Sequence, residues 1–334
     1  MTELSSQAVR LTEWTSCGGC AAKWGAAPLR ALVAELAAST TGLLVGLAPS
    51  DDAAVLRLSD EVALVSTTDF FPPLVDDPAD FGAIAAANAC SDVFAMGGRV
   101  VLALNVAAFP ERLPVEAVAA VLRAAAAVVE EAGGVIAGGH TIRSEEPIFG
   151  LAVQGLVHPD GVWSKADAQL GDVLVLSKPL GTGIVLAGDD DGAREAAIAG
   201  MRTLNRAAAE ALAEVGPHAV TDITGYGLLG HGWEVAERSG VALRFEAAAL
   251  PFYPGALAAA EAGVRTGGDA RNREHLDGRV VVGAAVSAAV EALAYDPQTS
   301  GGLLASVPPS AVASLPGFVV VGEVVDAPPR VELR

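Results

Sequence analysis

The sequence has little cysteine and few basic residues. Three cysteines among 334 residues are too few, and odd in number, for a structural disulfide framework. Lys and Arg total 21 against 40 Asp and Glu, which gives a net charge of −19. A nucleic-acid backbone would be repelled by this charge, and no local basic patch offsets it. We therefore expect no nucleic-acid partner.

Long apolar runs are also missing. The most apolar stretch, residues 100–109, is about half the length needed to cross a bilayer and is interrupted by Asn105. The first residues lack the basic and apolar regions of a secretory signal. These absences predict a cytoplasmic protein without a membrane segment.

The hydrophobic content of 52% is enough for a sizeable core in one large or two medium domains. Strand and helix patterns alternate from Ala53 onward, which predicts an α/β organisation. In the first half we expect strands at 53–58, 62–67, 100–109 and 148–157, and helices at about 80–96 and 114–132. In the second half, which begins near Gly161, we expect strands at 173–176, 241–245, 303–307 and 318–325, and helices at about 193–215 and 228–239.

Cys20 and Lys23 lie in the segment SCGGCAAKW, residues 16–24. A nearby cation lowers the pKa of a thiol and so increases the thiolate fraction. The glycines on one side of the cysteine also leave the sulfur accessible. Taken alone, a cysteine near a lysine is usually incidental, so this pair needs support from the rest of the chain.

Four aspartates recur beside strand ends, turns or glycines: Asp52, Asp69, Asp92 and Asp222. Carboxylates in apolar surroundings are costly to bury without a partner, and a divalent cation is such a partner. Oxygen ligands suit Mg²⁺, which commonly joins carboxylates to substrate phosphates. Asn88 lies four residues before Asp92 and would share its helix face. Each aspartate alone has an ordinary structural explanation, but the four together predict a metal site.

A glycine pair at Gly138 and Gly139 precedes His140 and Thr141. Such a turn exposes backbone N–H groups that can surround phosphate oxygens. The motif is weak, because it matches neither a Walker A sequence nor a dinucleotide fingerprint. Combined with metal carboxylates and Lys23, it indicates phosphoryl transfer.

Seven segments, in this order, resemble the selenophosphate synthetases (selenide, water dikinases). They are RLTEWTSCGGCAAKW, DDAAV, STTDFF, NACSDVFAMGG, AGGHTIRSEEPIFGLAVQG, TDITGYGLLGH and DPQTSGGLL. The resemblance covers nearly the whole chain. Fold relatives such as thiamine-monophosphate kinases, aminoimidazole ribonucleotide synthetases and hydrogenase-maturation E proteins are expected to lack the Cys–Lys segment together with the GGHT and PIFGL segments.

The resemblance implies a two-domain α/β (α+β) fold like that of aminoimidazole ribonucleotide synthetase, with N-terminal domains pairing their sheets across a homodimer. It divides the chain into a flexible segment 1–48 with one helix, an ATP-binding and dimerisation domain 49–158, and a C-terminal α/β domain 159–334. It implies synthesis of selenophosphate from selenide, ATP and water, with release of orthophosphate and AMP, and dependence on Mg²⁺.

The resemblance also assigns residues. Cys20 matches the catalytic cysteine and Lys23 the essential lysine, which also contacts ATP, both on a mobile flap. The metal ligands implied are Asp52, Asp92 and Asp222. The ATP contacts implied are Ser50, Asp51, Asp69 and Asp92, with Gly139, His140 and Thr141 supplied by the partner subunit.

The sequence departs from the family pattern at one place. Ala22 stands where the family often has a second cysteine before the lysine, and an additional Cys17 precedes Cys20 by three residues. This puts in doubt a mechanism that needs the second thiol. It also suggests a reversible Cys17–Cys20 disulfide that would switch off activity.

Two other functions stay open at this point. A small-molecule kinase of the same superfamily would use the same ATP site and release ADP, whereas a non-catalytic nucleotide-binding paralogue would bind ATP without turnover. The presence of both Cys20 and Lys23 argues against the second of these. A thiol oxidoreductase is weaker still, because the Cys-x-x-Cys segment opens no thioredoxin-like βαβ pattern.

Overall fold

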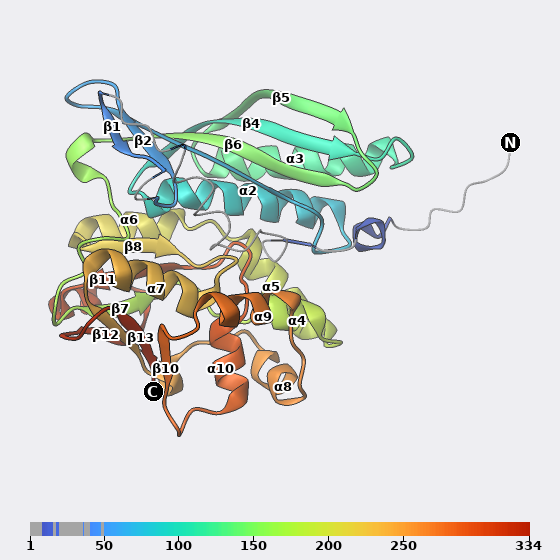
Figure 1. Ribbon diagram of the computed structural model, residues 1–334. Coiled ribbons are helices and arrows are strands. Elements are labelled where there is room, and N and C mark those ends of the chain that lie inside the picture. Colours follow the sequence, from blue (N-terminus) through green and yellow to red (C-terminus); the bar gives the residue numbers. More distant parts are fainter. Residues whose placement is uncertain (1–8, 16–17, 20–35, 37–40, 48–49) are drawn as a thin grey trace, which may run out of the picture.

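The computed structural model describes residues 9–15, 18–19, 36, 41–47 and 50–334. These residues form two β-sheets with helices packed against them, stacked as two layered units (Figure 1). Among the described residues, no helix is both long and apolar enough to span a membrane. The helix expected around Leu29 to Leu36 falls mostly outside the described part of the chain.

The first sheet has the strand order β1-β2-β3-β6-β4-β5. Neighbouring strands are antiparallel except β4 and β5, which run parallel. The strands are β1 (Leu43–Val45), β2 (Ala54–Arg57), β3 (Ala63–Phe71), β4 (Arg99–Phe109), β5 (Val135–Arg143) and β6 (Ile148–Val157).

Helices α2 (Pro78–Ala95) and α3 (Val115–Glu131) cover one face of this sheet, and α2 lies between the sheet and the second unit (Figure 1). Asp77 caps α2, because its carboxylate accepts from the N–H groups of Ala79 and Asp80. Every residue of α2 from Phe81 onward is buried, as expected for a helix with apolar neighbours on all sides. This central helix carries Asp92.

The second sheet has the strand order β10-β13-β9-β12-β7-β11-β8. Its strands are β7 (Val173–Leu176), β8 (Ala219–Asp222), β9 (Ala242–Phe245), β10 (Val280–Val282), β11 (Leu303–Val307), β12 (Val319–Val325) and β13 (Arg330–Leu333). The helices of this half are α4 (Thr182–Ala187), α5 (Asp191–Arg202), α6 (Arg206–Val215), α7 (Gly227–Ser239), α8 (Ala256–Glu261), α9 (Gly267–His275) and α10 (Ala288–Tyr295). Short 3₁₀ helices are η1 (Leu11–Trp14), η3 (Pro159–Gly161), η4 (Ala247–Ala249) and η5 (Pro309–Ser314).

The α/β organisation is confirmed, and most expected elements are present with shifted ends. The helix expected at 193–215 is wrong as a single element, because it is divided into α5 and α6. Asn205 lies at the break, where its buried side-chain amide donates to Ser91 Oγ and to the carbonyl of Gly301, both at 2.8 Å. These tertiary contacts bend the chain where alanine content favours a continuous helix.

The turn expected at Gly138 and Gly139 is also wrong, because both residues lie within β5. The strand continues through the glycines in parallel register with β4, with an irregularity opposite Ala103 and Leu104. A Cβ atom on Gly139 would lie 2.3 Å from the Asn105 carbonyl oxygen, and its φ is +146°. Glycine therefore permits close strand contact here rather than a phosphate-binding turn.

Candidate metal and nucleotide site

Three carboxylates from different elements meet between the two units. Asp52 precedes β2, Asp92 lies on α2, and Asp222 ends β8. One oxygen atom from each lies within 4.8 Å of the other two. The structure thus brings together the three residues that the family resemblance assigns to metal, one of them from the second unit. Asp69, the fourth aspartate of the sequence pattern, is not part of this cluster.

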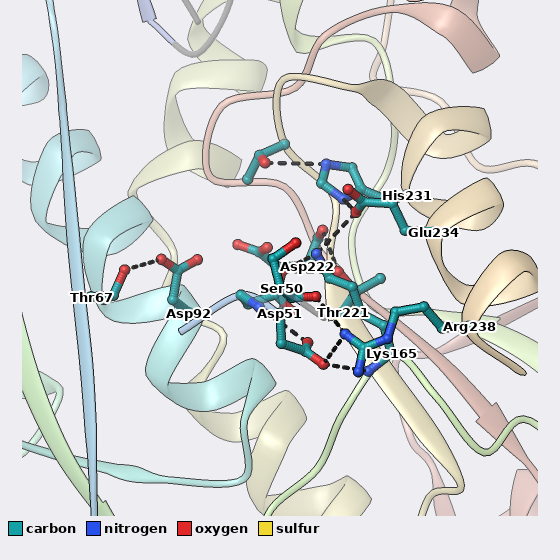
Figure 2. Close-up of polar contacts among 12 residues, drawn as sticks. Ser50, Asp51, Thr67, Asp92, Lys165, Thr221, Asp222, His231, Glu234 and Arg238 are labelled. Atoms are coloured by element: carbon teal, nitrogen blue, oxygen red, sulfur yellow. Dashed lines mark hydrogen bonds and ion pairs between the residues drawn. The ribbon is translucent and has the colours of Figure 1, made fainter. Parts of the chain in front are cut away.

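The carboxylates are held at some oxygens and open at others. Lys165 Nζ lies 2.7 Å from Asp52 Oδ1, and Thr67 donates to Asp92 Oδ2 at 2.5 Å (Figure 2). Asp52 Oδ2 and Asp222 Oδ2 are buried and have no hydrogen-bond partner among the described residues. Buried oxygens without partners are uncommon, and carboxylate oxygens in this arrangement suit a hard divalent cation. The residues present therefore fit a metal ion.

Burial raises the pKa of Asp92 well above its usual value, and the neighbouring charges of Asp69, Asp222 and Asp52 raise it further. Burial also raises the pKa of Asp52, more than the attraction of Lys165 lowers it. Close carboxylates resist simultaneous ionisation unless a cation compensates them. The protein's own side chains therefore leave the cluster short of positive charge.

Asp51 is held by the second unit. Its carboxylate Oδ2 accepts from Arg238 Nη1 at 2.8 Å and from the Lys165 backbone N–H at 3.1 Å (Figure 2). Arg238, on α7, also donates to the Ser50 carbonyl oxygen. Ser50 and Asp51 therefore lie beside the cluster, and the Asp51 carboxylate is already occupied by protein donors.

Asp69, on β3, is linked to the same region through α2. Asn88 Nδ2 donates to Asp69 Oδ2 at 2.6 Å, while Asn88 Oδ1 accepts from the Ser300 N–H at 2.9 Å. Asn88 and Asp92 both bond to side chains of β3, so they share a helix face as expected. Asn88 in this way connects β3 to the loop before β11.

A buried lysine that the sequence did not single out lies at the end of β7. Lys178 Nζ donates to the carbonyl oxygens of Thr203 and Ser300, at 2.6 and 2.9 Å. Burial lowers the pKa of Lys178 to about 7, although Asp222 counteracts the shift. The ammonium ties the loops at 203 and 300 together beside Asp222.

Sequence reasoning missed Lys165, Lys178, Glu234 and Arg238, because their partners are distant in the chain. One signal was present, since the sequence contains only three lysines. Two of them, Lys165 and Lys178, are 6% and 8% exposed. Because lysine is so rare in this chain, the burial of these two side chains indicates specific roles in the structure and not a contribution to surface charge.

Gly139, His140 and Thr141 are not brought to the cluster of their own chain. They lie on β5, an exposed strand at the edge of the sheet, which among the described strands pairs only with β4 (Figure 1). Strands β6 and β4 separate β5 from β3, where Thr67 contacts Asp92. Three interstrand spacings amount to about 14 Å. These residues are therefore remote from the β3 end of the cluster in their own chain.

Cys17, Cys20 and Lys23 lie outside the described residues. The nearest described residue, Gly19, donates its N–H to the Pro72 carbonyl oxygen at 2.9 Å. A Cβ atom on Gly19 would lie 2.7 Å from Thr299 Oγ1. Gly19 is thus held between the end of β3 and the loop that precedes β11.

Comparison with known proteins gives matches over both halves of the chain. The model for the N-terminal domain of AIR synthase related proteins matches residues 50–157, and the model for their C-terminal domain matches residues 169–332. Selenide, water dikinase from Caldanaerobacter subterraneus subsp. tengcongensis is 46% identical over 305 residues, covering 90% of this chain and 88% of that protein. Selenide, water dikinase from Burkholderia ambifaria is 46% identical over 341 residues, covering 97% of this chain and 96% of that protein.

Solved structures show the same fold at much lower identity. Thiamine monophosphate kinase from Aquifex aeolicus matches with a TM-score of 0.69 at 18% identity, over 92% of this chain and 96% of that one. Hydrogenase maturation protein HypE in complex with ATP matches with a TM-score of 0.57 at 20% identity, over 86% and 83%. These likenesses confirm the AIR-synthase-like fold.

Proposed function

The chain belongs to the selenide, water dikinase family, and from this premise we propose which residues carry its reaction. The enzyme makes selenophosphate from selenide, ATP and water. We assign the N-terminal domain to residues 49–158 and the C-terminal domain to 159–334, with ATP bound where Asp52, Asp92 and Asp222 meet. The observation that carries this assignment is that one buried oxygen on Asp52 and one on Asp222 have no hydrogen-bond partner in the part of the chain that the structure describes.

Asp52, Asp92 and Asp222 would hold Mg²⁺. When bound, the ion supplies positive charge that neutralises the triphosphate. Thr67 and Lys165 orient two of the three carboxylates by occupying one oxygen of each. Asn88 holds Asp69 at the edge of the same site.

Ser50, Asp51, Asp69 and Asp92 form the proposed nucleotide contacts of this chain. Because the Asp51 carboxylate is occupied by Arg238, a contact from this residue would come from its main chain. Gly139, His140 and Thr141 would contact the nucleotide bound by a partner subunit in a homodimer. Their position on an exposed edge strand, remote from their own carboxylates, supports this arrangement.

Cys20 and Lys23 are the proposed catalytic residues on the N-terminal segment. Hydrogen selenide anion attacks the γ-phosphorus of ATP, so a P–Se bond forms and the bond to the β-phosphate oxygen breaks, releasing ADP. Water then hydrolyses ADP to AMP and orthophosphate. Cys20 would face the selenium and Lys23 would stabilise the transferred charge. A cytoplasmic location is part of the proposal, supported by the small number of cysteines.

Phosphorus NMR of ATP incubated with the enzyme, with and without selenide, tests the activity. We expect selenophosphate, orthophosphate and AMP to appear together only when selenide is present. Accumulation of ADP as the final product with another acceptor would instead identify a small-molecule kinase. Nucleotide binding without turnover in either sample would identify a non-catalytic paralogue.

A further inference from the structure

We propose that Lys165 is a positioning residue for the metal site, whose ammonium holds Asp52 Oδ1 so that Asp52 Oδ2 remains available to the cation. This inference rests on the proposed metal site at Asp52, Asp92 and Asp222. Lys165 would support the site without being a ligand of the metal.

Lys165 bridges the two units. It lies between β6 and β7, and its Nζ is 2.7 Å from Asp52 Oδ1 and 2.9 Å from Glu234 Oε2. Asp52 belongs to the first unit, whereas Glu234 lies on α7 of the second. The lysine is 6% exposed, so its charge is directed at these carboxylates and not at solvent.

The main chain of Lys165 fixes the same segment a second time. Its N–H donates to Asp51 Oδ2, which also accepts from Arg238. Arg238 and Glu234 are four residues apart on α7 and so share one face of that helix. Residues 50–52 are therefore clamped to α7 at two successive carboxylates.

The clamp determines how the cluster is assembled. Asp222 ends β8 and α7 begins at Gly227, so a connection of only four residues links Asp222 to α7. Asp52 is positioned against this helix through Lys165 and Glu234. Figure 2 shows Lys165 and Glu234 beside Asp222. Lys165 consequently sets the position of a first-unit ligand relative to the second-unit ligand.

Positioning and simple charge attraction predict opposite signs for a substitution at Lys165. Removal of a positive charge beside a cation site should tighten metal binding if charge alone matters. Loss of the contact that orients Asp52 should weaken binding, and loss of such supporting contacts commonly costs 10- to 100-fold in metal affinity. The sign of the change therefore separates the two effects.

The experiment is a Mn²⁺ titration followed by electron paramagnetic resonance, using the full chain with the non-hydrolysable ATP analogue AMPPCP at saturation. We expect Lys165→Met to bind Mn²⁺ at least about tenfold more weakly than the parent protein. Glu234→Gln leaves an amide oxygen to accept from the ammonium, so we expect its loss to be about threefold or less. Tighter binding by Lys165→Met, or unchanged binding, would overturn the inference.

Arg244→Met is the matched control. Arg244 also bridges two carboxylates, Glu323 at 2.8 Å and buried Glu332 at 2.9 Å. It lies on β9, which three strands of the second sheet separate from β8 and Asp222. It should lower the melting temperature without changing Mn²⁺ affinity. If Lys165→Met does not fold, Lys165→Gln serves in its place, and its affinity must still fall below that of Glu234→Gln. Failure of the parent protein to bind Mn²⁺ would instead refute the metal site itself.

Discussion

Asp296 is a fully buried carboxylate without a cationic partner among its described hydrogen bonds. Asp296 Oδ2 accepts from the Ile184 N–H at 3.0 Å and from Gln298 Nε2 at 3.1 Å. Burial raises the pKa of Asp296 to about 7, even though these hydrogen bonds lower it. The side chain thus joins α4 to the loop before β11 at an electrostatic cost that depends on pH.

We predict that stability falls as pH rises because of this residue. Between the ordinary carboxylate range near pH 4 and the raised value of about 7, the folded protein keeps a proton that the unfolded chain has lost. The stability that the Asp296 proton contributes is therefore fully present below about pH 4 and is lost by about pH 7. Because one pKa unit corresponds to about 1.4 kcal/mol, the free energy of unfolding falls by roughly 4 kcal/mol over this range. Urea unfolding across this range should show this fall in the parent protein and not in Asp296→Asn.

The control for Asp296→Asn is Asp326→Asn, which makes the same chemical change at an exposed position. Its free energy of unfolding should run parallel to that of the parent protein at every pH. Parallel curves for Asp296→Asn would show that the buried carboxylate does not titrate in this range.

Cys20 gives a second prediction at the level of single residues. Serine has a much weaker tendency to ionise than cysteine, so Cys20→Ser should abolish selenide-dependent formation of AMP. Coupled measurement of AMP with and without selenide checks this, and Cys17→Ser under reducing conditions is the control. A normal rate in Cys20→Ser would rule out the proposed role of the thiol. Cys17→Ser should also lose any sensitivity to mild oxidation.

At the level of elements, sequence patterns predicted the helices and strands that depend on residues close together in the chain. The range expected for the helix at 228–239 nearly coincides with α7, and the strand at 303–307 coincides with β11. The break between α5 and α6 was missed because it depends on contacts of Asn205 with residues about 100 positions away. Lys165 was missed for the same reason, whereas the clustered aspartates were found because each stands near a strand end, a turn or a glycine in the sequence.

The α2–α3 contact gives a prediction at this scale. A Cβ atom on Gly82 would lie 2.2 Å from the Val121 carbonyl oxygen, and α3 backbone cannot move aside cheaply. Gly82→Ala should therefore destabilise the protein by about 1–3 kcal/mol, as overpacking in a core commonly does. Chemical denaturation measures this change. Gly267→Ala, at the first position of α9 with open space around it, should be neutral or slightly stabilising.

At the level of the whole molecule, the residues of the proposed site lie in two separate parts of one chain. The carboxylates lie between the units, whereas His140 and Thr141 lie on the exposed strand β5 at the sheet edge. Large apolar side chains are also exposed on this sheet, including Phe70, Leu104 and Ile142. In the proposed homodimer a second copy of the chain would cover these side chains and bring β5 to the other protomer's nucleotide. Local sequence patterns carry no information on such an arrangement.

Subunit complementation tests this assembly. In a homodimer with shared sites, Asp92→Asn removes the carboxylate contribution and His140→Ala removes the contribution from β5, so each variant alone should lose most of its activity. A mixed dimer still has one site built from an intact Asp92 and the partner's intact His140, while its other site carries both changes. Random exchange of equal amounts makes half of the dimers mixed, so activity should return to about a quarter of the parent value. If His140 served the site of its own chain, every site in the mixed dimer would be damaged and mixing would restore nothing.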